Sequence, residues 1–204
     1  MPFELLETLA FAPGAGYRRL EGHLARLRAS AAHFEVAMSG DPEEALREHS
    51  AGLTAPHRVR LLVDGGGRMR VESSLLQPVP KDVRVGRAPS PVDSESPWLR
   101  HKTTRRQVYD EALRARPDCD DVLLWNASGE ATETTIANLA VEGPGGALVT
   151  PPLACGLLPG VERAALLAEG RLREAVVHEA DLEAGQRLWL LNSVRGLYPA
   201  TFVG

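Results

Sequence analysis

The stretch "PSPVDSESPWLRHKTTRRQVYDEA", residues 89–112, predicts a chain that is divided into two lobes. Its first ten residues concentrate proline and serine, a composition typical of an exposed connector. The residues that follow have the spacing of a helix. We therefore expect an N-terminal lobe over residues 1–88, a connector over 89–99 and a C-terminal lobe over 100–204.

Lys102 lies where that helix is expected to begin, with Thr103 or Thr104 as its N-cap and with Val108 and Leu113 facing inward. The chain has only two lysines among 23 lysines and arginines. A lysine amine can bond covalently to an aldehyde, and a helix N-terminus disfavours its charged form. The sequence therefore marks Lys102 as a candidate nucleophile, although a solvated lysine at the end of a connector is the alternative.

The other lysine, Lys81, stands between Pro80 and Asp82 in a polar segment. Such a segment predicts a loop in which the amine is exposed to water. We therefore expect chemistry that requires a lysine to use Lys102.

Composition excludes several classes of protein. The 204 residues are 44% hydrophobic and 25% charged, which is typical of a globular protein, and the net charge is -4. Without a run of like charges, neither nucleic acid nor an anionic membrane is an expected partner. No apolar stretch approaches the ~18 residues that cross a membrane, and the N-terminus lacks signal-peptide features, so we expect a cytoplasmic protein.

Cysteine and histidine give no sign of a metal or a disulfide framework. Cys119 and Cys155 are too few for such a framework and lack the paired spacing of a zinc site. The histidines are scattered, without grouping. We expect no metal. The histidines are His23, His33, His49, His57, His101 and His178.

Hydrophobic periodicity predicts an α+β protein whose C-terminal half is mostly strand. Asp41 and Pro42 signal a helix start, and Pro159 and Gly170 bracket another helix. Helices are expected over 17–34, 41–53, 103–117 and 159–170. Strands are expected over 3–11, 57–67, 68–79, 82–88, 121–126, 131–141, 147–150, 174–180 and 186–192.

Six segments, in this order, resemble the fold-type IV pyridoxal-phosphate enzymes, which include branched-chain aminotransferase, D-amino-acid aminotransferase and aminodeoxychorismate lyase. The resemblance implies a small N-terminal α/β lobe that is shortened here, a larger β-rich pseudobarrel lobe, and pyridoxal 5'-phosphate in the cleft. It also implies a homodimer. The segments are "ETL" (7–9), "EGHLARLRASA" (21–31), "HKTTRRQVYD" (101–110), "SGEATETTIANLAV" (128–141), "TPPLACGLLPGVER" (150–163) and "NSVRGLYPA" (192–200).

The resemblance assigns Lys102 and Glu133 to the reactive parts of the cofactor. Lys102 matches the lysine that holds the cofactor covalently. Glu133 matches the carboxylate that hydrogen-bonds the pyridine nitrogen and keeps it protonated, so that the ring accepts electrons. Without the resemblance, Glu133 reads as an ordinary strand glutamate that faces water.

The resemblance also assigns residues to the cofactor's phosphate. Arg26 matches the phosphate-binding arginine, although alone it reads as a solvated helix residue. Backbone N–H groups of Gly160, Val161 and Glu162 are expected at a helix N-terminus, which binds anions. Ser193 falls where the family places a hydroxyl or amide donor. Glu162 departs from the hydroxyl of many relatives, so we expect it to contribute only its backbone.

One further departure concerns the cofactor's phenolic oxygen. Branched-chain aminotransferases place a tyrosine five residues after the lysine, where this chain has Gln107. The nearest tyrosine is Tyr109, to which the sequence alone assigns no role.

The resemblance is strongest to the lyase branch, which converts 4-amino-4-deoxychorismate to p-aminobenzoate and pyruvate in folate precursor synthesis. That substrate is a dicarboxylate, and Arg60 and Arg195 are the candidate cations for it, with a surface position as the alternative for each. A transaminase of branched-chain or D-amino acids is the second expectation. A cofactor-free binding or structural relative is the third.

Overall fold

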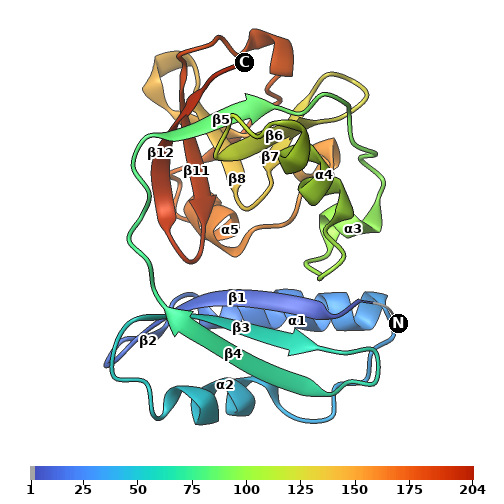
Figure 1. The fold of residues 1–204 in the computed structure, drawn as a ribbon, viewed down its shortest axis with the longest axis vertical. Helices are drawn as coiled ribbons and strands as arrows, with labels where there is room; N and C mark the ends of the chain where they lie inside the picture. The colour runs from blue at the N-terminus through green and yellow to red at the C-terminus, as the bar shows by residue number, and fades with distance from the viewer. Residues whose placement is uncertain (1–2) are drawn as a thin grey trace. The chain divides into compact units, whose positions relative to one another are not determined.

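The computed structural model describes residues 3–204, which form two compact units (Figure 1). Unit 1 runs to Pro78 and includes His101–Arg105. Unit 2 consists of Val79–Arg100 and Arg106–Gly204. The chain therefore returns to unit 1 for five residues before it completes unit 2.

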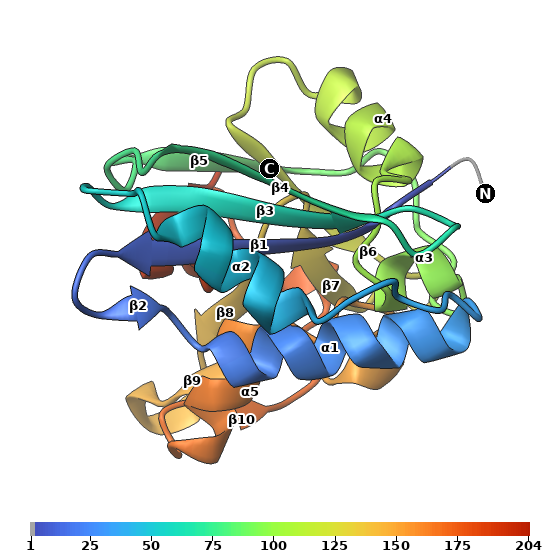
Figure 2. The same cartoon turned by 90° about the horizontal axis from the view of Figure 1, so that it is seen from below.

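Unit 1 is an antiparallel sheet with two helices packed against it (Figure 2). The strand order is β2-β1-β3-β4, with α1 beside β1 and α2 beside β4. The elements are β1 (Leu5–Ala12), β2 (Gly16–Tyr17), α1 (Leu20–His33), α2 (Pro42–Ser50), β3 (His57–Val63) and β4 (Met69–Leu75).

Alternation along β1 buries one row of side chains against the helices. Leu5 and Leu9 belong to this row and are fully buried, and Glu7 lies between them at 2% exposure. On β3, Leu61, Leu62 and Val63 are all buried. The helix start predicted at Asp41 is confirmed, because its side chain accepts a hydrogen bond from the Glu43 N–H at 3.0 Å.

The segment His101–Arg105 is extended and runs beside β1. The Lys102 carbonyl accepts from the Leu6 N–H at 3.0 Å, and Thr103 forms an isolated bridge with Leu5. The prediction of a helix capped by Thr103 or Thr104 was wrong. Helix α4 begins at Gln107. Pairing with a strand nearly a hundred residues earlier satisfies this backbone instead.

Unit 2 is a closed sheet with the strand order β10-β9-β8-β11-β12-β5-β6-β7. An additional pairing of β7 with β8 closes the strands from β8 to β7 into a ring, the pseudobarrel that the resemblance implied. The strands are β5 (Val83–Arg87), β6 (Asp121–Trp125), β7 (Ala131–Thr134), β8 (Asn138–Glu142), β9 (Leu148–Thr150), β10 (Arg173–Glu174), β11 (Arg187–Asn192) and β12 (Gly196–Phe202).

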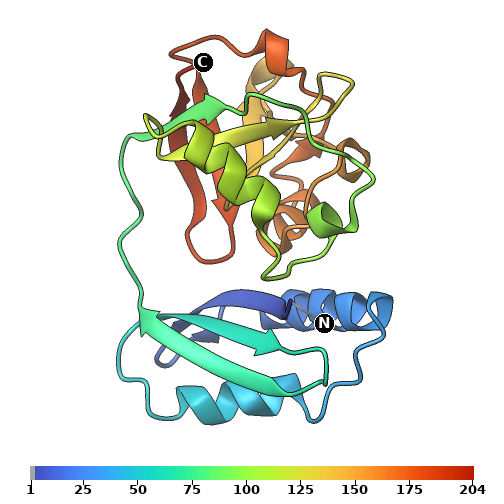
Figure 3. The same ribbon diagram turned by 45° about the vertical axis from the view of Figure 1, so that its right-hand side comes forward.

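Three α-helices accompany this sheet, and α4 lies against β6 (Figure 3). The α-helices are α3 (Pro97–Arg100), α4 (Gln107–Ala115) and α5 (Val161–Ala168), and the short 3-10 turns are η1 (Pro144–Gly146), η2 (Leu153–Cys155) and η3 (Glu179–Asp181). The interior of the ring is apolar and includes Leu123, Leu139, Leu190 and Phe202.

The division between the units differs from the expected connector at 89–99. Strand β5 was expected in the N-terminal lobe, but it pairs in parallel with β12 and β6 in unit 2. The proline-rich stretch is not exposed throughout, because Val92 and Leu99 are buried beside Tyr109 and Leu124. Apolar residues inside the stretch explain the difference, since their burial fixes it to unit 2.

Helix α4 presents a different face from the one predicted. Tyr109 and Ala112 are buried, Val108 is partly buried, and Leu113 is 39% exposed. Tyr109 and Ala112 belong to the same buried cluster as Val122 and Leu124 of β6. The inward position predicted for Leu113 was therefore wrong.

Within residues 3–204, no helix is both long and apolar enough to cross a membrane. The same residues contain no group of three or more metal-ligating side chains of the His, Cys, Asp or Glu type.

Candidate active site

The candidate residues divide between the two units. Arg26, Arg60 and Lys102 belong to unit 1, whereas Glu133, the start of α5, Ser193 and Arg195 belong to unit 2. Each set is assembled by contacts within its own unit.

In unit 1, Arg26 on α1 grips the buried carboxylate of Glu7 on β1. Arg26 Nε donates to Glu7 Oε1 at 2.9 Å, and Nη2 donates to Oε2 at 2.7 Å. His23 Nδ1, one turn earlier on α1, lies 2.6 Å from the same Oε2. We call these three residues the Glu7 cluster. Arg26 is only 10% exposed, so it is not the solvated helix residue that its position alone suggested.

Charge pairing decides the ionisation of the Glu7 cluster. Burial by itself raises the pKa of the Glu7 carboxyl, but Arg26 and His23 outweigh burial and lower the pKa to about 2. Glu7 is therefore an anion at neutral pH. His23 Nδ1 must then carry the proton that it donates to Glu7.

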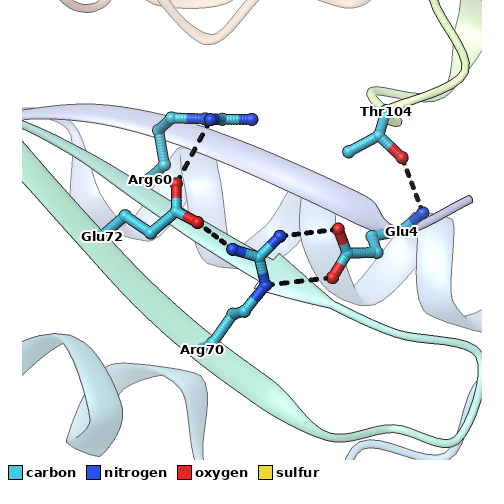
Figure 4. Close-up of polar contacts among 5 residues, drawn as sticks. All are labelled: Glu4, Arg60, Arg70, Glu72 and Thr104. Carbon is cyan, nitrogen blue, oxygen red and sulfur yellow. Dashed lines mark hydrogen bonds and ion pairs between the residues drawn. The ribbon is translucent and has the colours of Figure 1, made fainter.

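Lys102 is positioned by backbone pairing with β1. Its carbonyl bonds the N–H of Leu6, the neighbour of Glu7 along the chain. Two residues later, Thr104 Oγ1 accepts from the Glu4 N–H at 2.8 Å (Figure 4), and the Thr104 N–H donates to the Glu4 carbonyl at 2.9 Å. The lysine thus lies on a fixed extended segment. The expected effect of a helix N-terminus on its amine was wrong, because α4 begins at Gln107.

Arg60 belongs to a chain of ion pairs across the sheet of unit 1 (Figure 4). Arg60 Nη1 on β3 donates to Glu72 Oε2 at 3.2 Å, and Arg70 pairs with the other oxygen of Glu72. Arg70 also grips Glu4 at 2.8 and 3.2 Å. Arg60 is 34% exposed, so it is partly accessible from solvent. The chain of ion pairs ends at the residue whose backbone bonds Thr104.

In unit 2, three donors surround the carboxylate of Glu133 on β7, which is 3% exposed. The Tyr109 hydroxyl donates to Oε1 at 2.8 Å, and the Leu158 N–H donates to Oε1 at 3.2 Å. Asn138 Nδ2 donates to Oε2 at 3.2 Å. We call this group the Glu133 cluster. Glu133 does not face water, so the reading of an ordinary exposed strand residue was wrong.

The pKa of the Tyr109 hydroxyl depends on burial and on the charge of Glu133. Burial raises the pKa of the Tyr109 hydroxyl well above its ordinary value, and the Glu133 carboxylate raises it further. The hydroxyl therefore remains a proton donor at physiological pH. Its role could not be read from the sequence, because it comes from a contact between α4 and β7.

Asn138 joins the Glu133 cluster to the start of α5. Its Nδ2 also donates to the Leu158 carbonyl at 3.0 Å. Gly160 is the N-cap of α5, and a Cβ at this position would lie 1.8 Å from Asn138 Oδ1. Only glycine allows this approach. The first hydrogen bond within α5 runs from Ala164 to the Gly160 carbonyl, so the N–H groups of Gly160, Val161 and Glu162 precede it.

The turn of Ser193 and Arg195 lies beside the turn that follows Glu133. Asn192 Oδ1 accepts from the Arg195 N–H at 2.9 Å, and Asn192 Nδ2 donates to the Ile136 carbonyl at 3.3 Å. Ser193 is buried, and the Arg195 guanidinium lies 5.7 Å from the centre of the Tyr198 ring. Unit 2 thus brings its candidate residues together through Asn138 and Asn192.

Sequence reasoning missed the partners that hold the candidate residues. These are Glu7, His23, Tyr109, Asn138 and Asn192. Glu7 had a usable signal, since an acidic residue between Leu5 and Leu9 occupies a buried position of an alternating strand.

The model of the family "Amino-transferase class IV" matches residues 4–203 of this chain. The match spans nearly the whole chain and contains every candidate residue. The chain belongs to the class IV aminotransferases.

Three relatives illustrate the range of this family. A solved structure from Mesorhizobium loti, "Putative amino-acid aminotransferase", is 41% identical with a TM-score of 0.89, covering 98% of this chain and 100% of that one. "Putative aminodeoxychorismate lyase" of Schizosaccharomyces pombe is 32% identical over 86% of this chain and 80% of its own. "Probable branched-chain-amino-acid aminotransferase" of Thermotoga maritima is 27% identical over 97% of this chain and 75% of its own.

The cofactor of class IV aminotransferases is pyridoxal 5'-phosphate, and unit 2 fits it chemically. A buried carboxylate suits a protonated ring nitrogen, and a helix N-terminus suits a phosphate. Asn138 places these two features next to each other. The expectation of a fold-type IV protein with this cofactor is confirmed.

Proposed function

We propose that this chain is a pyridoxal-phosphate-dependent lyase that converts 4-amino-4-deoxychorismate to p-aminobenzoate and pyruvate. The observation that carries the proposal is the 32% identity to the Schizosaccharomyces pombe protein, whose name is "Putative aminodeoxychorismate lyase". That protein is matched over 80% of its own length. The lyase reaction is a β-elimination within one substrate and needs no amino-group acceptor.

Five parts of the chain would hold the cofactor. Lys102 would bond its aldehyde carbon, and Glu133 would accept a hydrogen bond from its ring nitrogen. Arg26, the N–H groups at the start of α5, and Ser193 would bind its phosphate. When bound, the cofactor supplies an electron sink for the carbon that bears the substrate's amine.

Proton transfer falls to Lys102 in this proposal. Its amine would remove the proton from the amine-bearing carbon of the substrate, and the ring would become aromatic as the enolpyruvyl group leaves. The pairing of its backbone with Leu6 and of Thr104 with Glu4 supports this role, because both fix the segment from which the amine projects. A fixed backbone at Lys102 lowers the entropy cost of bringing its amine into a reactive geometry.

Arg60 and Arg195 remain our candidates for the two carboxylates of the substrate. Arg60 is held by Glu72 and stays partly exposed, so its guanidinium retains donors for an incoming anion. Arg195 lies on the turn after β11 whose backbone Asn192 fixes. Both arginines stand on ordered backbone, which favours recognition of a rigid dicarboxylate.

A transaminase is the second candidate, favoured by the 41% identity to the Mesorhizobium loti protein named as an aminotransferase. Gln107 weighs against a branched-chain aminotransferase. Its side chain donates to Glu111 at 2.8 Å on the exposed face of α4, and it cannot supply the phenol expected at that position. Tyr109 does not take over the role of the missing tyrosine at position 107, because its hydroxyl donates to Glu133.

Release of p-aminobenzoate from 4-amino-4-deoxychorismate, without any 2-oxo acid, tests the proposal. We expect release by the wild type and by Lys81→Ala, and loss of at least about a thousandfold in Lys102→Ala, because this variant lacks the amine that we propose to bond the cofactor and to move the proton. Formation of glutamate from 2-oxoglutarate and an amino acid, without p-aminobenzoate, would establish the transaminase instead. A protein that takes up no added cofactor would be a binding or structural relative.

We also propose a homodimer, as the resemblance implies. Sedimentation equilibrium measures the mass in solution, and the mass of a single chain at micromolar concentration would contradict this assembly.

A further inference from the structure

Tyr109 makes a buried hydrogen bond that the resemblance does not assign. Its hydroxyl lies 2.8 Å from Glu133 Oε1, and both side chains are more than nine-tenths buried. Tyr109 comes from α4 and Glu133 from β7, so the contact joins a helix to the strand that carries the candidate carboxylate. A buried contact between a phenol and an ionised carboxylate is short and strong.

The surroundings of Tyr109 fix the direction of its hydroxyl. The Arg106 guanidinium lies over its ring, 4.6 Å from the centre, and Arg106 also donates to the Thr135 carbonyl in the turn after β7. On the apolar side, the ring packs with Leu99, Val122 and Leu124. The ring therefore has little freedom to turn away from Glu133.

The turn after β7 is anchored independently. The Asp121 carboxylate accepts from the Thr135 N–H at 2.9 Å and from its hydroxyl at 2.6 Å. Since Arg106 bonds the carbonyl of the same residue, Thr135 is held from both sides. The far end of β7 is thus fixed, and Tyr109 acts on a carboxylate whose backbone is already placed.

We propose that Tyr109 is a positioning residue for Glu133, which it keeps ionised and correctly turned toward the protonated ring nitrogen of the cofactor. This inference rests on the proposed function, because it takes Glu133 as the partner of that nitrogen. Tyr109 itself does not touch the reacting atoms in this account. It acts through the carboxylate.

The physical basis is competition for one proton. A proton between the ring nitrogen and Glu133 stays on the nitrogen when the carboxylate is stabilised as an anion. Tyr109 provides that stabilisation together with Leu158 and Asn138. A protonated ring is the better electron sink, so loss of the Tyr109 donor should weaken the chemistry and leave substrate binding nearly unchanged.

Nitrogen NMR of the holoenzyme loaded with ring ¹⁵N-labelled pyridoxal phosphate tests this assignment. In Tyr109→Phe, the pH midpoint for protonation of the ring nitrogen should fall by about one unit, a tenfold change, because a hydrogen bond to a charged group is lost. The kcat should fall by a similar factor while KM stays within about twofold. Tyr17→Phe is the matched control, since its hydroxyl bonds the Leu46 carbonyl in unit 1.

A second variant keeps the hydroxyl and tests the direction in which the pH midpoint of the ring nitrogen moves. Placing 3-fluorotyrosine at position 109 makes the phenol a stronger donor and preserves its size, so the midpoint should move upward instead. If both changes at Tyr109 leave the nitrogen midpoint where the wild type has it, the inference is overturned, and the lyase activity of the wild type stands unaffected.

A measurement without cofactor tests the hydrogen bond between Tyr109 and Glu133 independently of its role toward the cofactor. In the apoprotein, Glu133→Gln should lower the pKa of the Tyr109 hydroxyl toward its ordinary value, read from tyrosinate absorbance, because a neutral amide replaces the anion. An unchanged titration would contradict the contact and overturn the inference. A shifted titration in a protein that binds no cofactor would overturn the proposed function, and with it the purpose assigned to Tyr109.

Discussion

Two buried carboxylates, one in each unit, are held in opposite ways. Glu7 in unit 1 is paired with the guanidinium of Arg26, with contacts at 2.7 and 2.9 Å, and lies 2.6 Å from His23 Nδ1. Glu133 in unit 2 accepts from a phenol, an amide and a peptide N–H, all of which are neutral donors. Both side chains are almost completely buried.

Under the proposed function, the two carboxylates have different tasks. An arginine neutralises a carboxylate within the fold, so Glu7 is suited to holding Arg26 in place. Neutral donors stabilise an anion without cancelling its charge. In the proposed function, the Glu133 carboxylate is the partner of the protonated ring nitrogen.

Removing the anion of the Glu7 cluster should have the largest effect. Glu7→Gln removes the buried carboxylate charge that pairs with Arg26, and we expect the free energy of unfolding to fall by about 3 to 5 kcal/mol at pH 7. Urea denaturation measures this loss. Glu44→Gln is the control, because its ion pair with Arg47 is exposed. Equally small losses of unfolding free energy in Glu7→Gln and Glu44→Gln would show that burial does not strengthen the ion pair of Glu7.

The effect of Glu7 should depend on pH in one direction. Its folded pKa of about 2 lies below the ordinary 4.5, so its contribution to stability is complete above pH 4.5 and is lost as the pH falls toward 2. The shift corresponds to a loss on the order of 3 kcal/mol. The difference in unfolding free energy between wild type and Glu7→Gln should shrink over this range. A difference that stays constant from pH 7 to pH 2 would contradict the ion pair.

The Glu133 cluster can be disturbed without changing any of its charges. Gly160→Ala places a Cβ 1.8 Å from Asn138 Oδ1, which must move and release Glu133 and the Leu158 carbonyl. We expect a loss of about 1 to 3 kcal/mol in stability together with weaker cofactor binding, measured by urea denaturation and cofactor titration.

Gly52→Ala provides the control for that substitution, because a Cβ at Gly52 meets nothing within 4 Å. Equal cofactor affinity in Gly160→Ala and Gly52→Ala would show that Asn138 does not link the Glu133 cluster to α5.

The smallest effect is expected from the exposed chain of ion pairs. Glu72→Gln removes the partner that Arg60 and Arg70 share, yet all three side chains are accessible to solvent. We expect a change of less than about 1 kcal/mol in unfolding free energy, which added salt should reduce further. A loss as large as that of Glu7→Gln would mean that burial does not decide the strength of these pairs.

Local signals in the sequence predicted part of this structure. Asp41 starts a helix through a bond from the nearby Glu43 N–H, and Pro159 lies two residues before the first residue of α5, so these starts could be placed. Contacts between distant residues could not. The strand partner of Lys102 is nearly a hundred residues away, and its pairing converted an expected helix turn into extended chain.

The sequence led to candidate site residues but not to the residues that hydrogen-bond them. The resemblance supplied Lys102, Glu133 and Arg26 from segments of the sequence. Tyr109 and Asn138 gained their roles from the register of β6, β7 and β8, which periodicity does not determine. Leu113 was expected to face inward, but the buried residues of α4 are Tyr109 and Ala112.

The most direct test of this account is borohydride reduction of the protein with bound pyridoxal phosphate, followed by peptide mapping. The chain has two lysines, so the label has two possible side-chain amines. The account predicts a stable adduct on Lys102 in the wild type, the same adduct in Lys81→Ala, and no adduct in Lys102→Ala. An adduct on Lys81, or no adduct on a protein that retains the cofactor, would contradict it.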